Sequence, residues 1–290
     1  MMKKHWWLLA LIFLITPVPV AQCEWISLSK TLQEADVQRL SSDPRNPSLI
    51  LAASDKRLYK SPDGGNSWKQ VLSVRGAENR IQFIYFDESV RGRVYAATDK
   101  GIYRSDNYGD KWSLFFQGVG PDQNRVYAVS AWSHKNRKII LAGTADGLFT
   151  IDEESKSAER LESLPRTSVY SLLKLDRALF ALTEQGIYRT SEDDRWERVY
   201  VVVRAEVADA SLEQFDIEEM PTSPPASNLA FIANQNLLLC ATDKGVLESS
   251  LKGDQWNYLK DQPCKRIHAI AAGRDTFYTA TDLGIYRWNS

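Results

Sequence analysis

Apolar and polar residues alternate in short runs along most of this chain, and the runs are rich in β-branched and aromatic side chains. Alternation with a period of two directs one face of a strand into a core and the other toward solvent. Between the runs stand Asp, Gly, Asn and Ser, which favour chain reversal. In one stretch the pattern predicts strands at residues 81–86, 93–97, 101–104 and 112–116. The chain is therefore predicted to be all-β.

A short phrase returns six times: a small or apolar run, a turn built on Thr, Asp and Gly, and an apolar, aromatic and basic triplet. The copies are LAASDKRLYKS from Leu51, YAATDKGIYRS from Tyr95, LAGTADGLFTI from Leu141, FALTEQGIYRT from Phe180, LCATDKGVLES from Leu239 and YTATDLGIYRW from Tyr278. Their glycine-equivalent positions, from Arg57 to Gly284, are separated by 44, 46, 39, 59 and 39 residues. Strand-rich repeats of roughly 40 to 50 residues are typical of propeller blades. We therefore predict a six-bladed β-propeller of four-stranded antiparallel blades.

Tryptophans late in the repeats indicate how the ring closes. They lie 10 or 11 residues after the glycine-equivalent position in four repeats, at Trp68, Trp112, Trp196 and Trp256. The sixth repeat reaches Ser290 before such a residue occurs. Residues 25–28, from Trp25 to Leu28, are similar to the strand that follows Trp112. We predict that they form the fourth strand of the last blade, which would remove two open sheet edges.

The first 23 residues have a different character. Lys3 and Lys4 precede an apolar run at residues 6–15, which is followed by Thr-Pro-Val-Pro. Because a spanning helix needs about 20 apolar residues, this pattern predicts a secretory signal peptide over residues 1–23. In a second interpretation Cys23 is acylated as a lipoprotein anchor. Residues 24–290 would then form a single propeller domain outside the cytoplasm, periplasmic or secreted, either free or lipid-anchored.

Charge and cysteine content narrow the classes of partner. Without Lys3 and Lys4, the basic residues fall from 36 to 34 against 37 acids, a net charge of −3 that suggests neither nucleic acid nor anionic membrane. No later segment is apolar enough to span a membrane. Cys240 and Cys264 either form a disulfide or remain two thiols. With two mature histidines and no Cys-x-x-Cys pair, we expect no metal site and no cofactor.

Two turns before the outer strands share a motif. Its residues are Ser61, Asp63, Gly65 and Trp68 in the first repeat, and Ser105, Asn107, Gly109 and Trp112 in the second. The first copy resembles the Asp box of the Asp-box (BNR) repeat propellers, which include bacterial sialidases, sortilin-type receptors and photosystem II assembly factors. The motif is specific for architecture and not for any activity. We interpret Asp63 as an acceptor of backbone N–H groups, Gly65 as the residue that permits the turn, and Trp68 as packing between sheets.

The candidate binding residues lie where the inner strands begin. This face of the ring also carries the turns between second and third strands, and we call it the start face. Basic residues precede the inner strands at Arg80, Arg125, Arg166 and Arg266, and three residues occupy matching places one step inside them, Tyr127, Tyr170 and His268. Converging guanidinium groups would bind carboxylates by charge-assisted contacts. The alternative is that each Arg is a solvated residue stacked on a neighbouring aromatic ring.

An insertion at residues 204–228 accounts for the 59-residue spacing. From residue 205 it contains six acids and no Lys or Arg, and it ends in a proline-rich stretch. It joins the fourth and fifth blades on the start face. Long loops in compact domains are usually functional or disordered, so we expect a lid, an internal competitor for the basic residues, a partner-binding arm or a plain disordered insertion.

These features favour an exported, non-catalytic propeller that binds a protein or peptide, with acidic segments, as an assembly or accessory factor. The alternative that the resemblance implies is a sialidase-like glycoside hydrolase. In it Arg80, Arg125 and Arg266 would hold a substrate carboxylate, and Tyr127 or Tyr170 would be the nucleophile. The Arg-Ile-Pro motif of that family is absent, and two of its required roles have no residue here. A third possibility is a structural protein of the cell envelope.

Overall fold

We analysed a computed structural model of the 290-residue chain. It describes residues 37–134, 137–175, 178–190, 195–201, 226–232, 237–242, 244–260, 267–272, 276–281 and 284–289. The expected signal peptide, the closing strand at residues 25–28 and most of the acidic insertion lie outside these ranges. No helix in the described ranges is both long and apolar enough to cross a membrane.

The described residues form five four-stranded sheets and one three-stranded sheet. The first three sheets are β1 (Arg39–Asp43), β2 (Asn46–Ala53), β3 (Arg57–Ser61) and β4 (Lys69–Ser73); β5 (Ile81–Phe86), β6 (Val94–Thr98), β7 (Gly101–Ser105) and β8 (Ser113–Phe116); and β9 (Val126–His134), β10 (Arg137–Thr144), β11 (Gly147–Asp152) and β12 (Ala158–Arg160). The last three are β13 (Val169–Leu175), β14 (Ala178–Thr183), β15 (Gly186–Thr190) and β16 (Trp196–Val201); β17 (Ala226–Ile232), β18 (Leu237–Thr242), β19 (Gly245–Ser250) and β20 (Asn257–Tyr258); and β21 (Ile267–Ala272), β22 (Thr276–Thr281) and β23 (Gly284–Asn289). One short helix, α1 (Pro121–Asn124), precedes β9.

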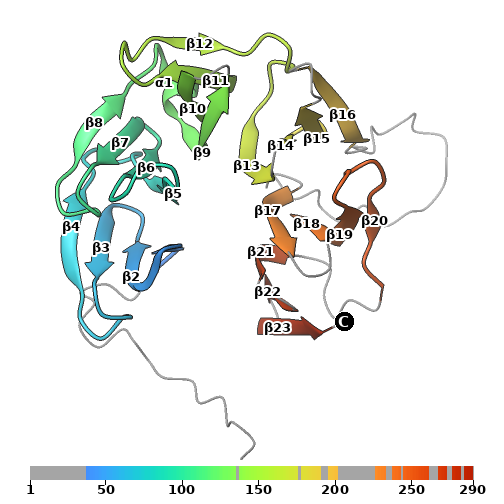
Figure 1. The fold of residues 1–290 in the computed structure, drawn as a ribbon, viewed down its shortest axis with the longest axis horizontal. Coiled ribbons are helices and arrows are strands. Elements are labelled where there is room, and N and C mark those ends of the chain that lie inside the picture. The colour runs from blue at the N-terminus through green and yellow to red at the C-terminus, as the bar shows by residue number, and fades with distance from the viewer. Residues whose placement is uncertain are drawn as a thin grey trace, which may run out of the picture.

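The sheets follow one another around a common centre (Figure 1). Within each sheet the strands are antiparallel and lie in chain order, so each strand pairs with the next one along the chain. The first strand of each sheet lies toward the centre, and successive first strands contact one another from β1 through β5, β9, β13 and β17 to β21. The sixth sheet has three strands among the described residues. Closure of the ring by residues 25–28 stays a prediction.

The recurring Thr-x-x-Gly phrase forms the turn between the second and third strands. The hydroxyl of Thr98 accepts the N–H of Lys100 (3.1 Å) and donates to the carbonyl of Gly101 (2.9 Å). The same pair of bonds recurs at Thr144, Thr183 and Thr242. Gly101 has φ +113°, and a Cβ there would lie 2.2 Å from the carbonyl oxygen of Phe116. The second repeat therefore needs its glycine for both backbone angle and space, whereas the first repeat has Arg57 at the equivalent position.

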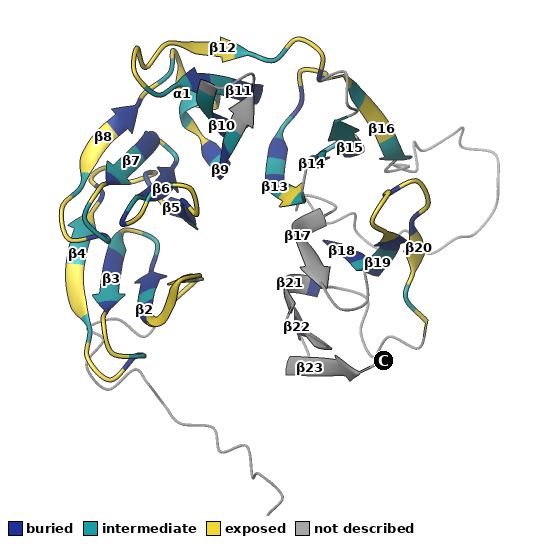
Figure 2. Cartoon of the chain, in the orientation of Figure 1, coloured by how far each residue is buried: buried dark blue, intermediate teal, exposed yellow. Residues whose placement is uncertain are grey.

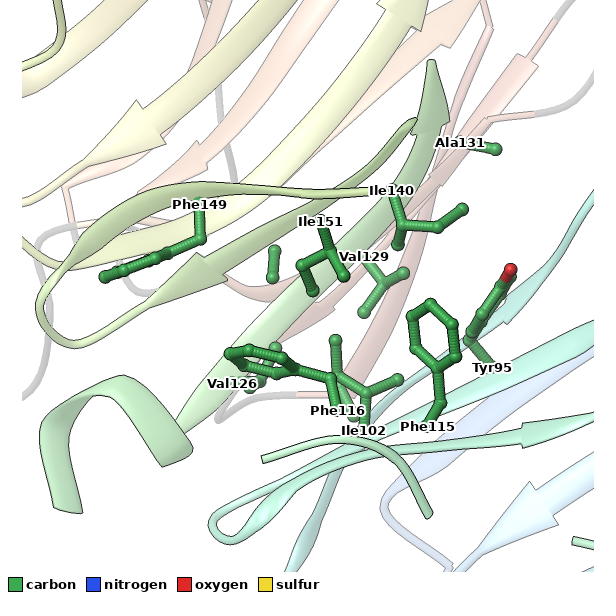
Figure 3. Packing of buried hydrophobic residues seen from close by; sticks show 12 residues of the cluster. Tyr95, Ile102, Phe115, Phe116, Val126, Val129, Ala131, Ile140, Phe149 and Ile151 are labelled. Atoms are coloured by element: carbon green, nitrogen blue, oxygen red, sulfur yellow. The ribbon is translucent and has the colours of Figure 1, made fainter. Parts of the chain in front are cut away.

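The core lies between the sheets rather than in one central mass. Middle strands such as β6 are buried throughout, because each sheet is covered on both faces by its neighbours (Figure 2). Figure 3 shows the junction between the second and third sheets, where side chains from both interdigitate. They include Tyr95, Ile102, Phe115 and Phe116 from the second sheet, and Val126, Ile140, Phe149 and Ile151 from the third. Each such side chain stabilises the fold by about 1.5 to 3 kcal/mol when fully buried.

The tryptophans that follow the third strands hold adjacent sheets together. Trp112 packs against a cluster that contains Leu49 and Leu51 of the first sheet, and its indole N–H donates to the carbonyl of Gly109 (2.8 Å). Trp256 makes the equivalent bond to Gly253 (3.0 Å) and packs against residues of the fourth sheet. The divergent copy of the motif around Trp256 therefore keeps the same packing role as the better-matched one.

Candidate functional site

The start face assembles from the first residues of β5, β9 and β13 and from the turns that precede β3, β7, β11 and β15. Backbone bonds tie each turn to the strand beside it. The N–H of Asp99 donates to the carbonyl of Arg80 (3.1 Å), and that of Ala145 to Arg125 (3.1 Å). The turns and the strand starts therefore lie at one level, as the repeat pattern predicted.

The three described arginines of this face each lie beside an acid from the turn of the preceding sheet. Arg166 Nε hydrogen-bonds Asp146 Oδ1 at 2.5 Å. The other two contacts are looser, with Arg80 Nε 3.9 Å from Asp55 Oδ2 and Arg125 Nε 3.9 Å from Asp99 Oδ1. All three arginine side chains remain exposed, at 60%, 46% and 71% for Arg80, Arg125 and Arg166. The face is thus a series of acid–base pairs across sheet junctions rather than a purely basic surface.

Two of these acids are themselves held in place. Asp99 accepts hydrogen bonds from the backbone N–H of Arg80 (3.0 Å) and from the side-chain amide of Gln82 (2.9 Å). Asp146 accepts from Gln123 (3.4 Å) as well as from Arg166. The hydrogen bond that Arg166 donates to Asp146 raises the pKa of Arg166, so this side chain stays charged at any ordinary pH.

The residues at matching places inside the inner strands share one backbone feature. In each of five inner strands the pairing register shifts at this position, so that one residue is left over as a β-bulge. The shifts lie between Ile81 and Phe83, Val126 and Ala128, Val169 and Ser171, Ala226 and Asn228, and Ile267 and Ala269. A bulge redirects a side chain and bends its strand. The residue left over at the bulge of each strand is Gln82, Tyr127, Tyr170, Ser227 or His268.

Tyr127 and Tyr170 come together on adjacent inner strands. Their ring centroids are 5.3 Å apart with an interplanar angle of 49°. Both side chains are partly exposed, at the same end of the strands as Arg125 and Arg166. Aromatic pairs at this distance attract each other and present a wide surface with polar hydroxyls. The structure thus joins two candidate residues that lie 43 positions apart in the sequence.

Several candidate residues lie partly or wholly outside the described part of the chain. Arg266 lies outside the described residues, and for His268 only the backbone, within β21, is described. Most of the insertion at residues 204–228 is also outside, but its last residues, from Ala226, belong to strand β17. Cys240 is a buried free thiol, and Cys264 is not among the described residues. Within the described ranges, no three His, Cys, Asp or Glu side chains cluster as metal ligands would.

The turn motif of the first repeat has the geometry expected of a structural element. The Asp63 carboxylate accepts the N–H (2.9 Å) and the hydroxyl (2.6 Å) of Ser67 and the hydroxyl of Ser61 (2.8 Å). Gly65 has φ +97° and donates its N–H to Ser61 Oγ (2.7 Å). The hydroxyl of Ser67 is the largest contributor that lowers the pKa of Asp63.

The second repeat reproduces the motif with Asn107 in place of Asp. The amide oxygen of Asn107 accepts the N–H of Lys111 (2.8 Å) and the hydroxyl of Ser105 (2.9 Å), and Gly109 donates to Ser105 Oγ (2.9 Å). One oxygen acceptor is therefore sufficient for the turn. These motifs lie on the face opposite the start face, because they connect third strands to fourth strands.

The pairing acids were not identified from the sequence. The sequence pattern indicates only that Asp55, Asp99 and Asp146 are turn residues, although each follows a Ser or Thr by one or two positions. A cavity on the opposite face, described below, had no signal in the sequence at all.

Comparison with solved structures defines the class of protein. The extracellular domain of a hybrid two component system from B. thetaiotaomicron superposes with a TM-score of 0.64 at 18% identity, over 88% of this chain and 32% of that one. YCF48 bound to D1 peptide gives 0.55 at 16%, over 83% and 74%. An ancestral GH74 enzyme gives 0.58 at 16%, over 88% and 37%. These are β-propellers, and the fold of this chain is a β-propeller.

The likeness extends to the fold alone, since the identities are low. The chain spans about a third of the length of the extracellular domain it resembles. No protein-family model matches the chain, and no curated protein matches its sequence. The membership of the Asp-box repeat propellers stays a prediction.

Proposed function

We propose that this chain is an exported, non-catalytic scaffold that binds a protein or peptide through its start face. The observation that carries the proposal is the Tyr127–Tyr170 pair, set at bulged positions of two neighbouring inner strands. Partly exposed tyrosines with a polar end and a large apolar ring are enriched at binding surfaces. One similar propeller, YCF48, has been solved with a bound D1 peptide, so the fold can hold a peptide.

The arginines near this pair suit an acidic partner. Arg80 Nε and Arg125 Nε each lie 3.9 Å from the carboxylate of their neighbouring acid, beyond hydrogen-bond distance. A carboxylate from a partner can approach closer and form the stronger, charge-assisted bond. Arg166 is instead committed to Asp146, so it serves to position the surface. We therefore assign partner binding to Arg80 and Arg125, with Arg266 and His268 as further members by their place in the repeat.

A binding role agrees better with the acids of this face than hydrolysis does. A glycosidase needs a carboxyl group placed to exchange protons with its substrate. Asp99 and Asp146 instead accept hydrogen bonds from Gln82 and from Arg166, which fixes them as structural acceptors. The sialidase-like alternative would need its acid and its activating carboxylate from other residues.

The proposal includes the architecture that delivers this face. The six sheets would be six blades of one domain over residues 24–290, with residues 25–28 completing the last blade. Residues 1–23 would direct export, with Cys23 as the point of lipid attachment if the protein is anchored.

Site-specific photo-crosslinking in the native cell tests the assignment. Benzoylphenylalanine in place of Tyr127 should capture a discrete protein partner. The matched control places it at Leu114, which is exposed on the outer strand β8. Arg80→Glu combined with Arg125→Glu should lower the yield at the first position while leaving the unfolding midpoint unchanged. Equal capture at both positions, or capture unaffected by the charge reversal, would reject the start face as the binding surface.

A further inference from the structure

A cavity of about 670 Å³ lies between the first and second sheets, on the face opposite the Tyr127–Tyr170 pair. Four turns surround it: those between β1 and β2, β3 and β4, β5 and β6, and β7 and β8. Its apolar lining comes from Leu49 and Phe86, which are buried, and from the partly buried Val90. Ligand sites in proteins are typically apolar cavities of this size with a few polar groups.

Tyr108 lines this cavity in an unusual backbone conformation. Its φ is +59°, and it is one of two non-glycine residues with positive φ in the described part of the chain. The same position in the first repeat is Gly64, with φ +71°. Both residues donate a backbone N–H to a carbonyl near the start of the second strand of their sheet. Gly64 donates to Ser48 within β2 (2.8 Å), and Tyr108 donates to Gly92 just before β6 (2.7 Å).

The backbone conformation of this turn therefore favours glycine at this position, and a residue with a bulky side chain there is strained. Strained residues persist where the surrounding structure holds them, and they cluster at binding sites. Gly92 accommodates the ring closely, since a Cβ at Gly92 would lie 3.1 Å from the Tyr108 ring. The second repeat thus places an aromatic side chain where the first has none, at the wall of a cavity.

Two arginines of the cavity donate side-chain hydrogen bonds to neutral oxygen atoms. Arg91 Nε donates to the hydroxyl of Tyr108 (2.7 Å), and Arg45 donates to the backbone carbonyl of Glu88. Both side chains belong to exposed residues. Guanidinium groups form stronger bonds to a carboxylate than to a neutral oxygen, so both can gain from an anionic ligand.

The other charged groups of the cavity are matched within the protein. Lys60 pairs with Asp110 (2.7 Å), and Arg93 pairs with Asp106 (2.6 Å). The Asp87 carboxylate is bound by Lys138 (2.6 Å). Asp43 is buried and accepts the backbone N–H of Arg45 (2.9 Å), which leaves Glu88 as the exposed acid at the rim.

We propose that this cavity binds a peptide segment in which an apolar or aromatic side chain is followed by a carboxylate. The apolar side chain would rest on Leu49, Phe86 and Val90 against the ring of Tyr108. The carboxylate would take hydrogen bonds from Arg45 and Arg91. The site is separate from the start face and does not depend on the function proposed for it.

Titration calorimetry with defined peptides tests the site. The probe is N-acetylated, C-amidated Gly-Phe-Asp-Gly, and its neutral twin carries Asn in place of Asp. The intact mature protein should bind the Asp peptide at least about tenfold more tightly, and raising salt should reduce the difference as exposed charges are screened. A Gly-Phe-Lys-Gly peptide should bind most weakly, since it would meet Arg45 and Arg91.

Variants separate the two parts of the site. Arg91→Gln should remove the preference for Asp over Asn. Tyr108→Asn, which keeps a residue that tolerates positive φ, should weaken both peptides about equally. Lys69→Gln on the outer strand β4 is the matched control and should change neither affinity. Arg80→Gln with Arg125→Gln should also leave both unchanged, which distinguishes this cavity from the start face.

Other outcomes overturn the inference. Equal binding of the Asp and Asn peptides, or tighter binding of the Lys peptide, would reject an acidic ligand. Unchanged affinity in Tyr108→Asn, or no binding of any peptide at millimolar concentration, would reject the cavity as a peptide site. Loss of binding in the Arg80 and Arg125 variant would move the ligand to the opposite face.

Discussion

The ammonium group of Lys138 lies 2.6 Å from Asp87 Oδ2, across the junction between the second and third sheets. The Asp87 side chain is fully buried, and Ser89 donates both its N–H (2.9 Å) and its hydroxyl to the other oxygen. Burial alone would raise the pKa of Asp87, but the bonds from Lys138 and Ser89 outweigh it and lower the pKa. The ionised carboxylate therefore stabilises the fold above its unfolded pKa, and this contribution is lost as pH falls through the folded value.

Replacing Asp87 by Asn should accordingly destabilise the protein at neutral pH. We expect a loss of about 1 to 3 kcal/mol at pH 7, the scale of a buried hydrogen bond to a charged group. Below about pH 4 the difference should shrink, because Asp87 of the unfolded chain then binds a proton while the folded carboxylate, whose pKa is lowered, still resists protonation. Urea denaturation at pH 7 and below about pH 4 measures this difference in the free energy of unfolding. Asp110→Asn is the control, since the Asp110 carboxylate that pairs with Lys60 is 58% exposed and should contribute at most about 1 kcal/mol. A loss independent of pH would mean that the charge is not responsible.

Two glycines with positive φ should respond very differently to alanine. At Gly101 a Cβ would lie 2.2 Å from the carbonyl oxygen of Phe116, whereas at Gly64 nothing lies within 4 Å. We expect Gly101→Ala to cost about 3 to 5 kcal/mol, from backbone strain and overpacking together. Gly64→Ala should cost about 1 kcal/mol, from strain alone. Chemical denaturation compares the two, and similar losses would show that the backbone angle rather than space requires the glycine.

Asp63 should be replaceable by Asn but not by Ala. The amide oxygen of Asn107 makes the equivalent bonds in the second repeat, to Lys111 and Ser105. Asp63→Ala removes the carboxylate that accepts hydrogen bonds from Ser67 and Ser61, and it should lower the melting temperature, while Asp63→Asn should lower it much less. Because the folded pKa of Asp63 is lowered, the difference between Ala and Asp should diminish in acid. Calorimetric melting at pH 7 and pH 3 checks both expectations. Binding of a start-face partner should be unaffected, and its loss with intact stability would make the turn a binding site.

The thiol of Cys240 should be unreactive in the folded protein. It is fully buried in β18, and burial raises its pKa far above neutrality, so almost no thiolate is present. Iodoacetamide should modify it slowly in buffer and rapidly in denaturant, as mass spectrometry of the alkylated peptide would show. A Cys264→Ser background isolates Cys240. Fast labelling under native conditions would contradict the burial of Cys240. If Cys240 of the natural sequence resists alkylation in denaturant without reductant, while Cys240 in the Cys264→Ser variant does not, a disulfide with Cys264 is indicated.

Removing the predicted closing strand should weaken the whole ring. A mature chain that begins at residue 29 would leave two sheet edges unpaired, which favours aggregation and lowers stability. The urea midpoint and the light scattering on concentration should both change relative to a chain that begins at residue 24. A chain beginning at residue 25 serves as the control. Identical stability of all three would reject this closure.

The sequence by itself determined the local elements of this protein. Period-two alternation and turn residues predicted a strand at residues 81–86, and β5 has these bounds. The strand predicted from residue 112 begins at Ser113, because the Trp112 ring turns into the core between the first two sheets. Repeat spacing predicted the propeller class, since each blade is specified by contacts within about 45 residues of chain, and the Thr98 turn is specified within four.

The tertiary structure decided which residues meet across sheets. Matching repeat positions predicted that Tyr127 and Tyr170 share a register, but the bulge and the 5.3 Å ring separation depend on how two adjacent blades are rotated against each other. The acids beside Arg80 and Arg125 could not be predicted from the sequence for the same reason, since Asp55 and Asp99 approach them across a sheet junction. The cavity beside Tyr108 forms only where turns of two sheets come together. Alternation and turn residues encode distances along one strand or hairpin, whereas the spacing between blades follows from the packing of all their side chains at once.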